Sequence, residues 1–378
     1  MPLSPYQVVN LQNSPDQENE VQRLAKIEAH IPFDLAGDSL IRVKLLQLSQ
    51  LEYVLLLTIH HIVCDAWSMG ILLQELSSLY PAFCAGKPSP LPDLPIQYVD
   101  YTLWQWEFLT TEVLQRQFNY WTRQLAGVQP LLELPTDKPR KTFHKFKGSS
   151  LEFDIDAQLS QQLKTLSQQS GVTLFMTLLA AFVTLLYRYS DRGDILVGSP
   201  IANRHHHDTK SLIGLFVNIL VLRFKIPENF SFSELLNQVR DVALAAYTHQ
   251  DVPFEQLVKT LLPDRSLSQS PLVQVVFSLE PAPRPWELPG LSVTPIKIES
   301  MTAKFDLTLS MVETATGLKA TWEYNSDLFE RQAIARMSGH FQTLLAAVAT
   351  NPNQTLAQIP LLTDAELKRE QAIGNRNQ

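Results

Sequence analysis

The sequence predicts an α/β protein in which mixed sheets with flanking helices form two lobes. Apolar residues make up 45% and charged residues 18% of the 378-residue chain, which is typical of a globular protein with more than one domain. Strand-like runs alternate with helical patterns in both halves, without the strict rhythm of parallel βαβ units. The linker-like segment LPTDKPR at 134–140 divides the chain. We therefore expect lobes at 1–135 and 136–363, followed by a polar linker at 364–378.

The first elements of the chain are expected to be a short strand and a capped helix. The short strand is expected within residues 1–12, which include its apolar residues. Ser14 then suits the N-cap of a helix, because Pro15 fits the first helical position and a glutamine follows three residues after the cap. Pro32 is expected to end this helix.

Two more strands and two helical regions complete the first half. LIRVKLLQL (40–48) partly alternates and predicts a half-buried strand, whereas the nearly continuous apolar run YVLLLTI (53–59) predicts a strand buried on both faces. Apolar residues at helical spacing predict an amphipathic helix over 67–83. A tryptophan-rich helical stretch covers 98–125, after a proline-rich loop at 86–95.

The second half continues the mixture of strands and helices. The expected strands are 150–155, 195–201, 216–224, 271–279 and 305–313, with another opening 321–329, and the expected helices are 157–169, 173–189, 232–247 and 330–349. Their interleaving predicts mixed α/β layers.

Composition excludes several classes of function. The 31 basic and 38 acidic residues leave a net charge of −7, which argues against nucleic acid as the main partner. Two cysteines cannot build a disulfide framework or a four-cysteine zinc site. No apolar run approaches the roughly 20 residues of a membrane span, and the first residues do not read as a signal peptide. We expect a cytoplasmic protein that binds neither nucleic acid nor membrane.

The sharpest motif is HHIVCD at 60–65, where an apolar strand meets a helix. Adjacent strand residues point to opposite faces, so only one of the two histidines can face a given cavity. A histidine beside a helix N-terminus can act as a general base, and the nearby N–H groups can hold an oxyanion. Asp65 equally suits a helix N-cap, and a buried histidine pair has a structural role more often than a catalytic one.

The sequence gives little support for a metal site or for other catalytic motifs. The tract HHHD at 205–208 suits a solvated loop better than a metal site, and adjacent strand histidines diverge too far to share one ion. The nucleophile elbow, the Walker A loop, the dinucleotide-binding turn and the HExxH helix are all absent from the sequence. We expect no metal site, and Cys64 to be a packed small residue.

Further motifs follow one another in a fixed order. They are PFDL (32–35), HHIVCDAWS (60–68), YVDY with Trp104, PIANR (200–204), IGLFVN (213–218) through Arg223, HQDVPFE (249–255), RSLS (265–268) through Pro271 and Leu272, KFDL (304–307) and EYNSDLF (323–329). This ordered set resembles the condensation domain of nonribosomal peptide synthetases, in the chloramphenicol-acetyltransferase-like superfamily. The motif HHxxxD alone is shared by several acyltransferase families, whereas the ordered set is specific.

The resemblance implies a V-shaped pair of acetyltransferase-like lobes with the active site in a tunnel between them. The opening RHExLRT motif of the family is absent, so the first lobe is expected to be incomplete, in a fragment of a longer synthetase or a chain with a mis-assigned start. Ala66 stands where the family has glycine. Alanine is unwelcome there only if the position needs a positive φ or a close backbone approach.

The chemistry that the resemblance implies is amide bond formation between two thioesters. The α-amine of an acceptor aminoacyl thioester attacks a donor aminoacyl or peptidyl thioester, which is already activated and needs neither ATP nor metal. Donor and acceptor peptidyl carrier proteins would bring both substrates on phosphopantetheine arms, so that this chain binds no cofactor of its own. The tail after 361–366 resembles the lead into an adenylation domain, which is therefore an expected downstream neighbour.

The resemblance also assigns roles to single residues. His61 is expected to face the tunnel and to take the proton of the amine or orient the amine, with His60 supporting it from the other face. Asp65 is expected to form a structural ion pair, with Arg223 as the candidate partner. Asn325 is an expected positioning residue near the site.

The residues after the motif aspartate, Ala66, Trp67 and Ser68, are expected to be structural or positioning residues near the site, and Trp67 and Ser68 also bear on the subtype. Tryptophan precedes serine here, whereas epimerization domains reverse this order and heterocyclization domains replace the histidine pair with aspartate. The block SLSQSPLVQVVF (266–277) resembles domains that join two L-residues. Two alternatives stay open: a free-standing acyltransferase that uses acyl-CoA, and an inactive remnant that only docks carriers or neighbouring domains.

Overall fold

A computed structural model describes residues 6–37, 39–128, 132–140, 147–261, 272–282, 286–298 and 302–374. They form two compact units that are discontinuous in sequence. Unit 1 comprises 1–106, 204–217 and 284–298, and unit 2 comprises 107–203, 218–283 and 299–378. Two segments from the second half of the chain thus belong to unit 1, while the expected lobe boundary near residue 135 stays a prediction.

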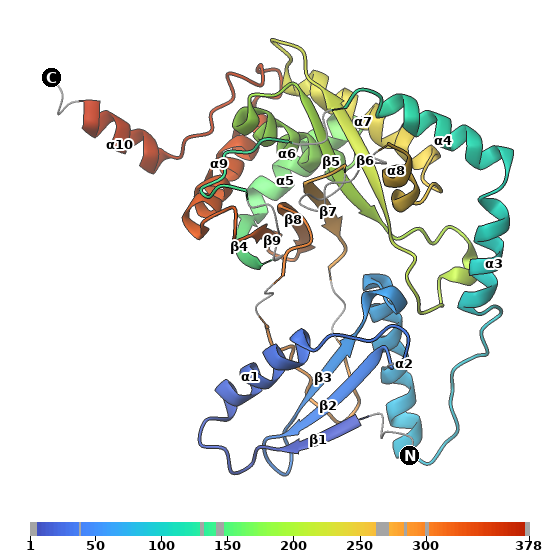
Figure 1. Cartoon of the computed structure of the whole chain (residues 1–378). Helices are drawn as coiled ribbons and strands as arrows, with labels where there is room; N and C mark the ends of the chain where they lie inside the picture. Colours follow the sequence, from blue (N-terminus) through green and yellow to red (C-terminus); the bar gives the residue numbers. More distant parts are fainter. Residues whose placement is uncertain are drawn as a thin grey trace. The chain divides into compact units, whose positions relative to one another are not determined.

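Unit 1 is built around a three-stranded sheet in the order β1-β2-β3 (Figure 1). The strands are β1 (Tyr6–Asn10), β2 (Ile41–Gln47) and β3 (Tyr53–Ile59), and the helices are α1 (Gln17–His30), α2 (Ala66–Cys84) and the start of α3 (Tyr98–Phe108). β1 runs parallel to β2, and β3 runs antiparallel to it. A small core joins one face of this sheet to α1 through Val21, Ala25, Leu46 and Leu56.

Two expectations for these elements are wrong. The N-cap of α1 is Asp16, not Ser14, because the Asp16 carboxylate accepts hydrogen bonds from both the backbone and the side chain of Asn19. β3 is not buried on both faces: only Leu56 is buried, and Leu55 is 41% exposed. β3 is the last strand of the described sheet and is covered on one face by α1, so its apolar composition exceeds its burial.

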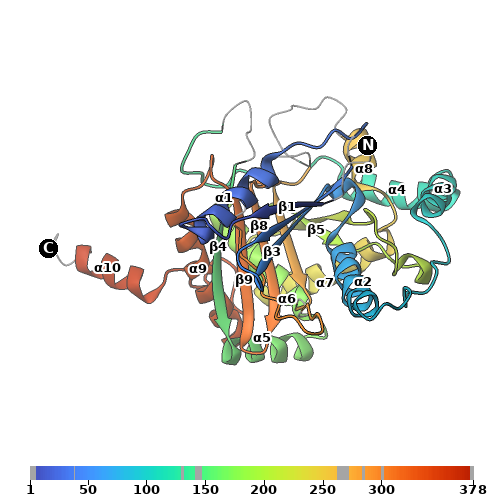
Figure 2. The ribbon, with the colours of Figure 1, turned by 90° about the horizontal axis from the view of Figure 1, so that it is seen from below.

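Unit 2 contains a six-stranded mixed sheet in the order β4-β9-β8-β7-β5-β6. Its strands are β4 (Gly148–Asp156), β5 (Asp194–Ile201), β6 (Asn218–Lys225), β7 (Val275–Glu280), β8 (Leu307–Thr314) and β9 (Gly317–Asn325). The helices of this part of the chain are α4 (Glu112–Gln124), α5 (Ala157–Gln169), α6 (Leu174–Ser190), α7 (Phe232–Thr248), α8 (Phe254–Leu261), α9 (Arg331–Thr350) and α10 (Asp364–Gly374). The alternate residues of β8 and β9 that face the helices are apolar and buried, so α5, α6, α7 and α9 cover one face of the sheet (Figures 1 and 2).

Most of the expected elements are confirmed, but two of the differences have local causes. The helical stretch at 98–125 is broken into α3 and α4, because Thr111 caps a new helix by accepting a hydrogen bond from the N–H of Leu114. The tail contains the unexpected helix α10. Thr363 and Glu366 form a reciprocal capping box at its start, which is the signal in the sequence that could have predicted it.

Within the described residues, no single helix is long and apolar enough to cross a membrane. Only α5 and α6 together pass that test of length and composition, and they are bent by 105° with respect to each other.

Candidate active site

The histidine motif lies in a turn of unit 1 between β3 and α2. β3 ends at Ile59, and residues His61–Val63 form a single 3₁₀ turn before α2 begins at Ala66. The N–H of His60 still donates to the carbonyl of Leu40, at 2.9 Å, which extends the β2–β3 ladder by one bond. The expectation that both histidines lie in an extended strand and alternate between its faces is therefore wrong for His61, because the chain turns directly after His60, which is itself still extended.

Backbone partners give the two histidine rings opposite tautomers. The Nδ1 atom of His61 lies 2.7 Å from the carbonyl oxygen of Cys64, which can only accept, so Nδ1 carries the proton and Nε2 of the neutral ring carries the lone pair. The Nδ1 atom of His60 lies 3.1 Å from the N–H of Ile62, which can only donate, so Nδ1 accepts and Nε2 carries the proton. His61 is exposed and His60 is half-buried. The arrangement leaves His61 with an accessible basic nitrogen.

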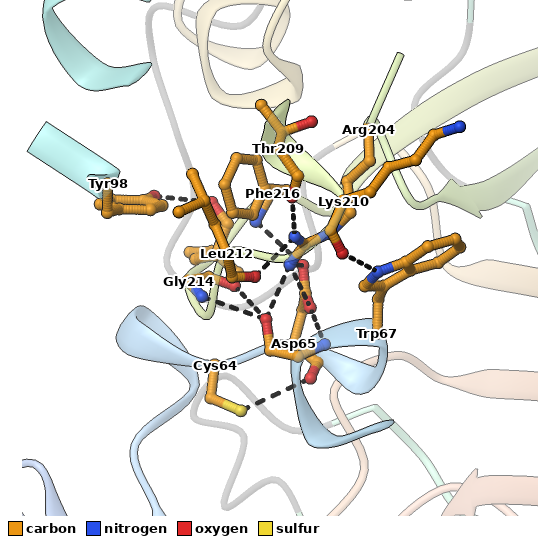
Figure 3. Close-up of polar contacts among 12 residues, drawn as sticks. Cys64, Asp65, Trp67, Tyr98, Arg204, Thr209, Lys210, Leu212, Gly214 and Phe216 are labelled. Carbon is orange, nitrogen blue, oxygen red and sulfur yellow. Dashed lines mark hydrogen bonds and ion pairs between the residues drawn. The ribbon is translucent and has the colours of Figure 1, made fainter. Parts of the chain in front are cut away.

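Asp65 combines the two roles that the sequence left open. It is the N-cap of α2 and accepts from the N–H of Ser68 at 2.8 Å. It also lies 3.2 Å from the guanidinium of Arg204 and accepts from the N–H of Phe216 (Figure 3). Burial alone would raise the pKa of the Asp65 carboxyl, but the two backbone N–H groups, the Ser68 side chain and the Arg204 charge together hold it below its usual value.

The expected pair between Asp65 and Arg223 is wrong. Arg223 lies in unit 2, where its guanidinium makes two hydrogen bonds to Asp194, at 2.7 and 2.8 Å. The partner of Asp65 is Arg204, the last residue of the PIANR motif. Arg204 belongs to unit 1 because the segment 204–217 leaves the second half of the chain and packs there. This contact joins residues that are far apart in sequence. Local sequence patterns do not reveal such contacts.

Arg204 holds the segment 204–217 to the start of α2. Its side chain is 1% exposed, and its guanidinium donates to the carbonyls of Thr209 and Leu212 and to the Ser68 hydroxyl (Figure 3). It also lies 3.9 Å from the centre of the Phe216 ring, within range of a cation–π interaction.

The residues that follow Asp65 anchor the same segment. The Trp67 indole N–H donates to the carbonyl of Lys210, at 3.0 Å, and the Ser68 hydroxyl bonds both backbone groups of Gly214. A Cβ atom at Gly214 would lie 2.2 Å from the ring of Tyr98, so this position requires glycine. Ala66 has no positive φ and is the first residue of α2, so alanine is conformationally ordinary in place of the family's glycine.

The start of α2 offers fewer oxyanion donors than a free helix N-terminus, because Asp65 already occupies the N–H of Ser68. Asn325 ends β9 in unit 2, where it is buried and its side-chain oxygen accepts from the N–H of Asp327. Its expected role near the active site stays a prediction.

The HQDVPFE motif has a structural role in unit 2 that sequence reasoning missed. Asn218, the first residue of β6, donates to the carbonyls of Gln250 and Val252, and its side-chain oxygen accepts from the N–H of Phe254. Asp251 and Gln117 of α4 exchange two hydrogen bonds. These contacts join β6 and α4 to the corner between α7 and α8.

The tract at 205–208 is exposed, as a solvated loop requires. Across the part of the chain that the structure describes, no three His, Cys, Asp or Glu side chains gather as a metal-ligand set. The RSLS block lies outside the described residues.

Comparisons with known proteins agree with this fold and motif order. The family model for the condensation domain matches residues 4–369, and the chain belongs to that family. A linear gramicidin synthase polypeptide of Brevibacillus parabrevis is 48% identical over 359 residues, a match that covers 94% of this chain and 7% of that protein. Malpinin synthetase of Mortierella alpina is 44% identical over 359 residues, covering 95% of this chain and 5% of that protein. The chain therefore spans less than a tenth of the length of either relative.

Solved structures show the same architecture. The X-domain from teicoplanin biosynthesis superposes with a TM-score of 0.86 at 27% identity, over 94% of this chain and 81% of that one. The first condensation domain of the CDA synthetase superposes with a TM-score of 0.76 at 21% identity, over 95% and 78%. The expected fold class, mixed α/β sheets with flanking helices as in condensation domains, is confirmed.

Proposed function

We propose that this chain catalyses amide bond formation between a donor aminoacyl or peptidyl thioester and the α-amine of an acceptor aminoacyl thioester. The observation that carries the proposal is the tautomer of His61, whose exposed ring presents a basic Nε2 while Nδ1–H donates to the carbonyl of Cys64. An α-amine with a pKa of about 7.7–8.0 is mostly protonated at neutral pH, so a proton must leave before or during attack. His61 is the group that takes it.

The proposed step balances without an added reactant. The amine nitrogen bonds to the thioester carbonyl carbon, and the carbon–sulfur bond breaks. The proton that His61 accepts from the ammonium group passes to the leaving sulfur, and the second proton that the attacking nitrogen loses goes to water. The bond from Nδ1–H to the Cys64 carbonyl steadies the ring in both protonation states. His60 supports the turn through the N–H of Ile62, and the buried pair of Asp65 and Arg204 holds the start of α2.

The substrates are proposed to arrive on phosphopantetheine arms of donor and acceptor carrier proteins, with an adenylation domain as downstream neighbour. The small share of the gramicidin synthase polypeptide that this chain matches supports such a modular setting. Joining of two L-residues is supported by the block SLSQSPLVQVVF (266–277), and the order of Trp67 and Ser68 argues against an epimerization domain. A cytoplasmic location stays a prediction.

The test is peptide bond formation between a loaded donor carrier and a loaded acceptor carrier, followed by intact-protein mass spectrometry. The unchanged chain is compared with His61→Ala and with His207→Ala, a control whose side chain is 94% exposed. We expect product from the unchanged chain and the control and none from His61→Ala.

The same assay separates the alternative functions. Product with an acyl-CoA donor but not with a donor carrier would instead indicate a free-standing acyltransferase. Absence of product from the unchanged chain with either donor, while the carriers still bind, would indicate a docking domain.

A further inference from the structure

The ring of His60 is held by a stack of side chains outside the histidine motif. The ring centres of Phe33 and His60 are 5.5 Å apart, and their planes cross at 84°. The guanidinium carbon of Arg42 lies 3.7 Å from the centre of the same Phe33 ring. Both contacts are typical of favourable aromatic geometry. Phe33 thus connects a cation on β2 with the first histidine of the motif.

Arg42 is itself tightly held at the end of α1. Its Nε donates to the Glu28 carboxylate at 2.5 Å, and its Nη2 donates to the carbonyls of Glu28 and Ile31. Glu28 is only 2% exposed and also pairs with Lys44. Burial alone would raise the pKa of the Glu28 carboxyl, but its hydrogen bonds to Lys44 and Arg42 hold it below its usual value. The guanidinium is therefore fixed by a charged partner and by the last carbonyls of the helix.

The sheet register places these groups on one face. Arg42 is directly opposite Thr58 in the β2–β3 ladder. His60 is two residues beyond Thr58, and its N–H bond to Leu40 continues the ladder, so it lies on the face of Arg42. Phe33 fills the space between them from the connection that follows α1.

We propose that Phe33 and Arg42 are positioning residues for the histidine turn. They hold the His60 ring in the orientation in which Nδ1 accepts from the N–H of Ile62, and that bond shapes the turn that presents His61. A His60 ring free to rotate by half a turn would leave this N–H without its acceptor. The inference rests on the proposed function, because it concerns the placement of the proposed base.

Two matched substitutions separate this role from general stability. Arg42→Lys keeps a cation beside Glu28 but removes the planar group that covers Phe33. Lys44→Arg changes the other cation on the same carboxylate and leaves the stack intact. Phe33→Leu removes the ring, and Phe33→Tyr restores it.

We expect Arg42→Lys and Phe33→Leu to lower kcat by at least about tenfold with little change in KM, since a displacement of about 1 Å in a catalytic group can cost about 100-fold. Lys44→Arg and Phe33→Tyr should stay within about twofold of the unchanged chain. Unchanged kcat in both Arg42→Lys and Phe33→Leu would overturn the proposal. If Phe33→Leu does not fold, the pair at Arg42 and Lys44 decides it.

A second readout does not depend on activity. In protein labelled with ¹⁵N-histidine, the ring nitrogens of His60 should report a single tautomer protonated at Nε2 in the unchanged chain and in Lys44→Arg. Arg42→Lys and Phe33→Leu should show a mixture. Unaltered His60 signals in both would overturn the inference. If the unchanged chain forms no product, the proposed function is overturned but the inference is not. The nitrogen signals of His60 would still decide the role of Phe33 and Arg42.

Discussion

The carboxylate of Asp65 lies 3.2 Å from the Arg204 guanidinium, and these two side chains are only 3% and 1% exposed. The residues are 139 positions apart in sequence. The same carboxylate caps α2, so one side chain sets both the start of the helix and the position of the segment 204–217. The aspartate of the motif thus connects the start of a helix to a segment that is distant in sequence.

Removing one member of this pair should leave a buried, uncompensated charge. We expect Arg204→Gln to lower the free energy of unfolding by about 3–5 kcal/mol, measured by urea titration. Arg23→Gln, which breaks an exposed pair with Glu20, is the control and should change stability little. Equal, small effects of the two substitutions would contradict the structural role of Arg204.

Stability should depend on pH through Asp65. Its pKa is lowered in the folded protein, so the unfolded state binds more protons as the pH falls and the stabilisation is lost. The contribution is fully present above the unfolded pKa of about 3.9 and disappears as the pH falls through the lower folded value. Asp65→Asn should therefore be less stable than the unchanged chain at pH 7, with a difference that narrows below about pH 4. Unfolding free energies measured from pH 7 to pH 3 would show a constant difference if Asp65 did not titrate in this way.

His60 should be replaceable by a residue that accepts from the same N–H. Asparagine has a side-chain oxygen at a similar distance from the backbone as Nδ1, so we expect His60→Asn to retain condensation within about tenfold. His60→Leu offers no acceptor for Ile62 and should lose about 100-fold, as expected for a displaced catalytic group. Rates from the carrier assay compare the two variants, and equal losses would argue against the acceptor role.

Ala66 should tolerate the glycine that stands at this position in the resembling family. Because Ala66 lies in ordinary helical backbone, Ala66→Gly should cost up to about 1 kcal/mol of stability and leave the condensation rate within about twofold. Thermal unfolding and the carrier assay measure the two effects. A large gain in rate would show that the alanine methyl group obstructs the substrate.

Local patterns in the sequence are sufficient to predict most of the strands and helices and the capping role of Asp65. They fail where neighbouring signals compete: Ser14 and Asp16 both suit an N-cap, and the carboxylate that makes two hydrogen bonds is the one used. The capping box of Thr363 and Glu366 is readable in the sequence, but it stands in a polar tail with little apolar periodicity to support a helix.

The other wrong predictions concern contacts between parts of the chain that are distant in sequence. Arg204 and Arg223 both belong to matched motifs, and nothing local distinguishes the one that returns to Asp65. The tautomers of His60 and His61 depend on a 3₁₀ turn, whereas the apolar run before it suggests that the strand continues. Apolar composition also overstates the burial of β3, because composition does not reveal how many neighbours a strand has.

The edge position of β3 determines how concentrated solutions of this polypeptide should behave. An apolar strand that ends the described sheet is a template for pairing with the same strand of another molecule. Light scattering should therefore rise steeply with concentration, and Leu55→Lys should suppress this self-association, because a charge on an edge strand opposes pairing. The edge of this sheet, as well as the stability of the fold, would then influence the solubility of the polypeptide.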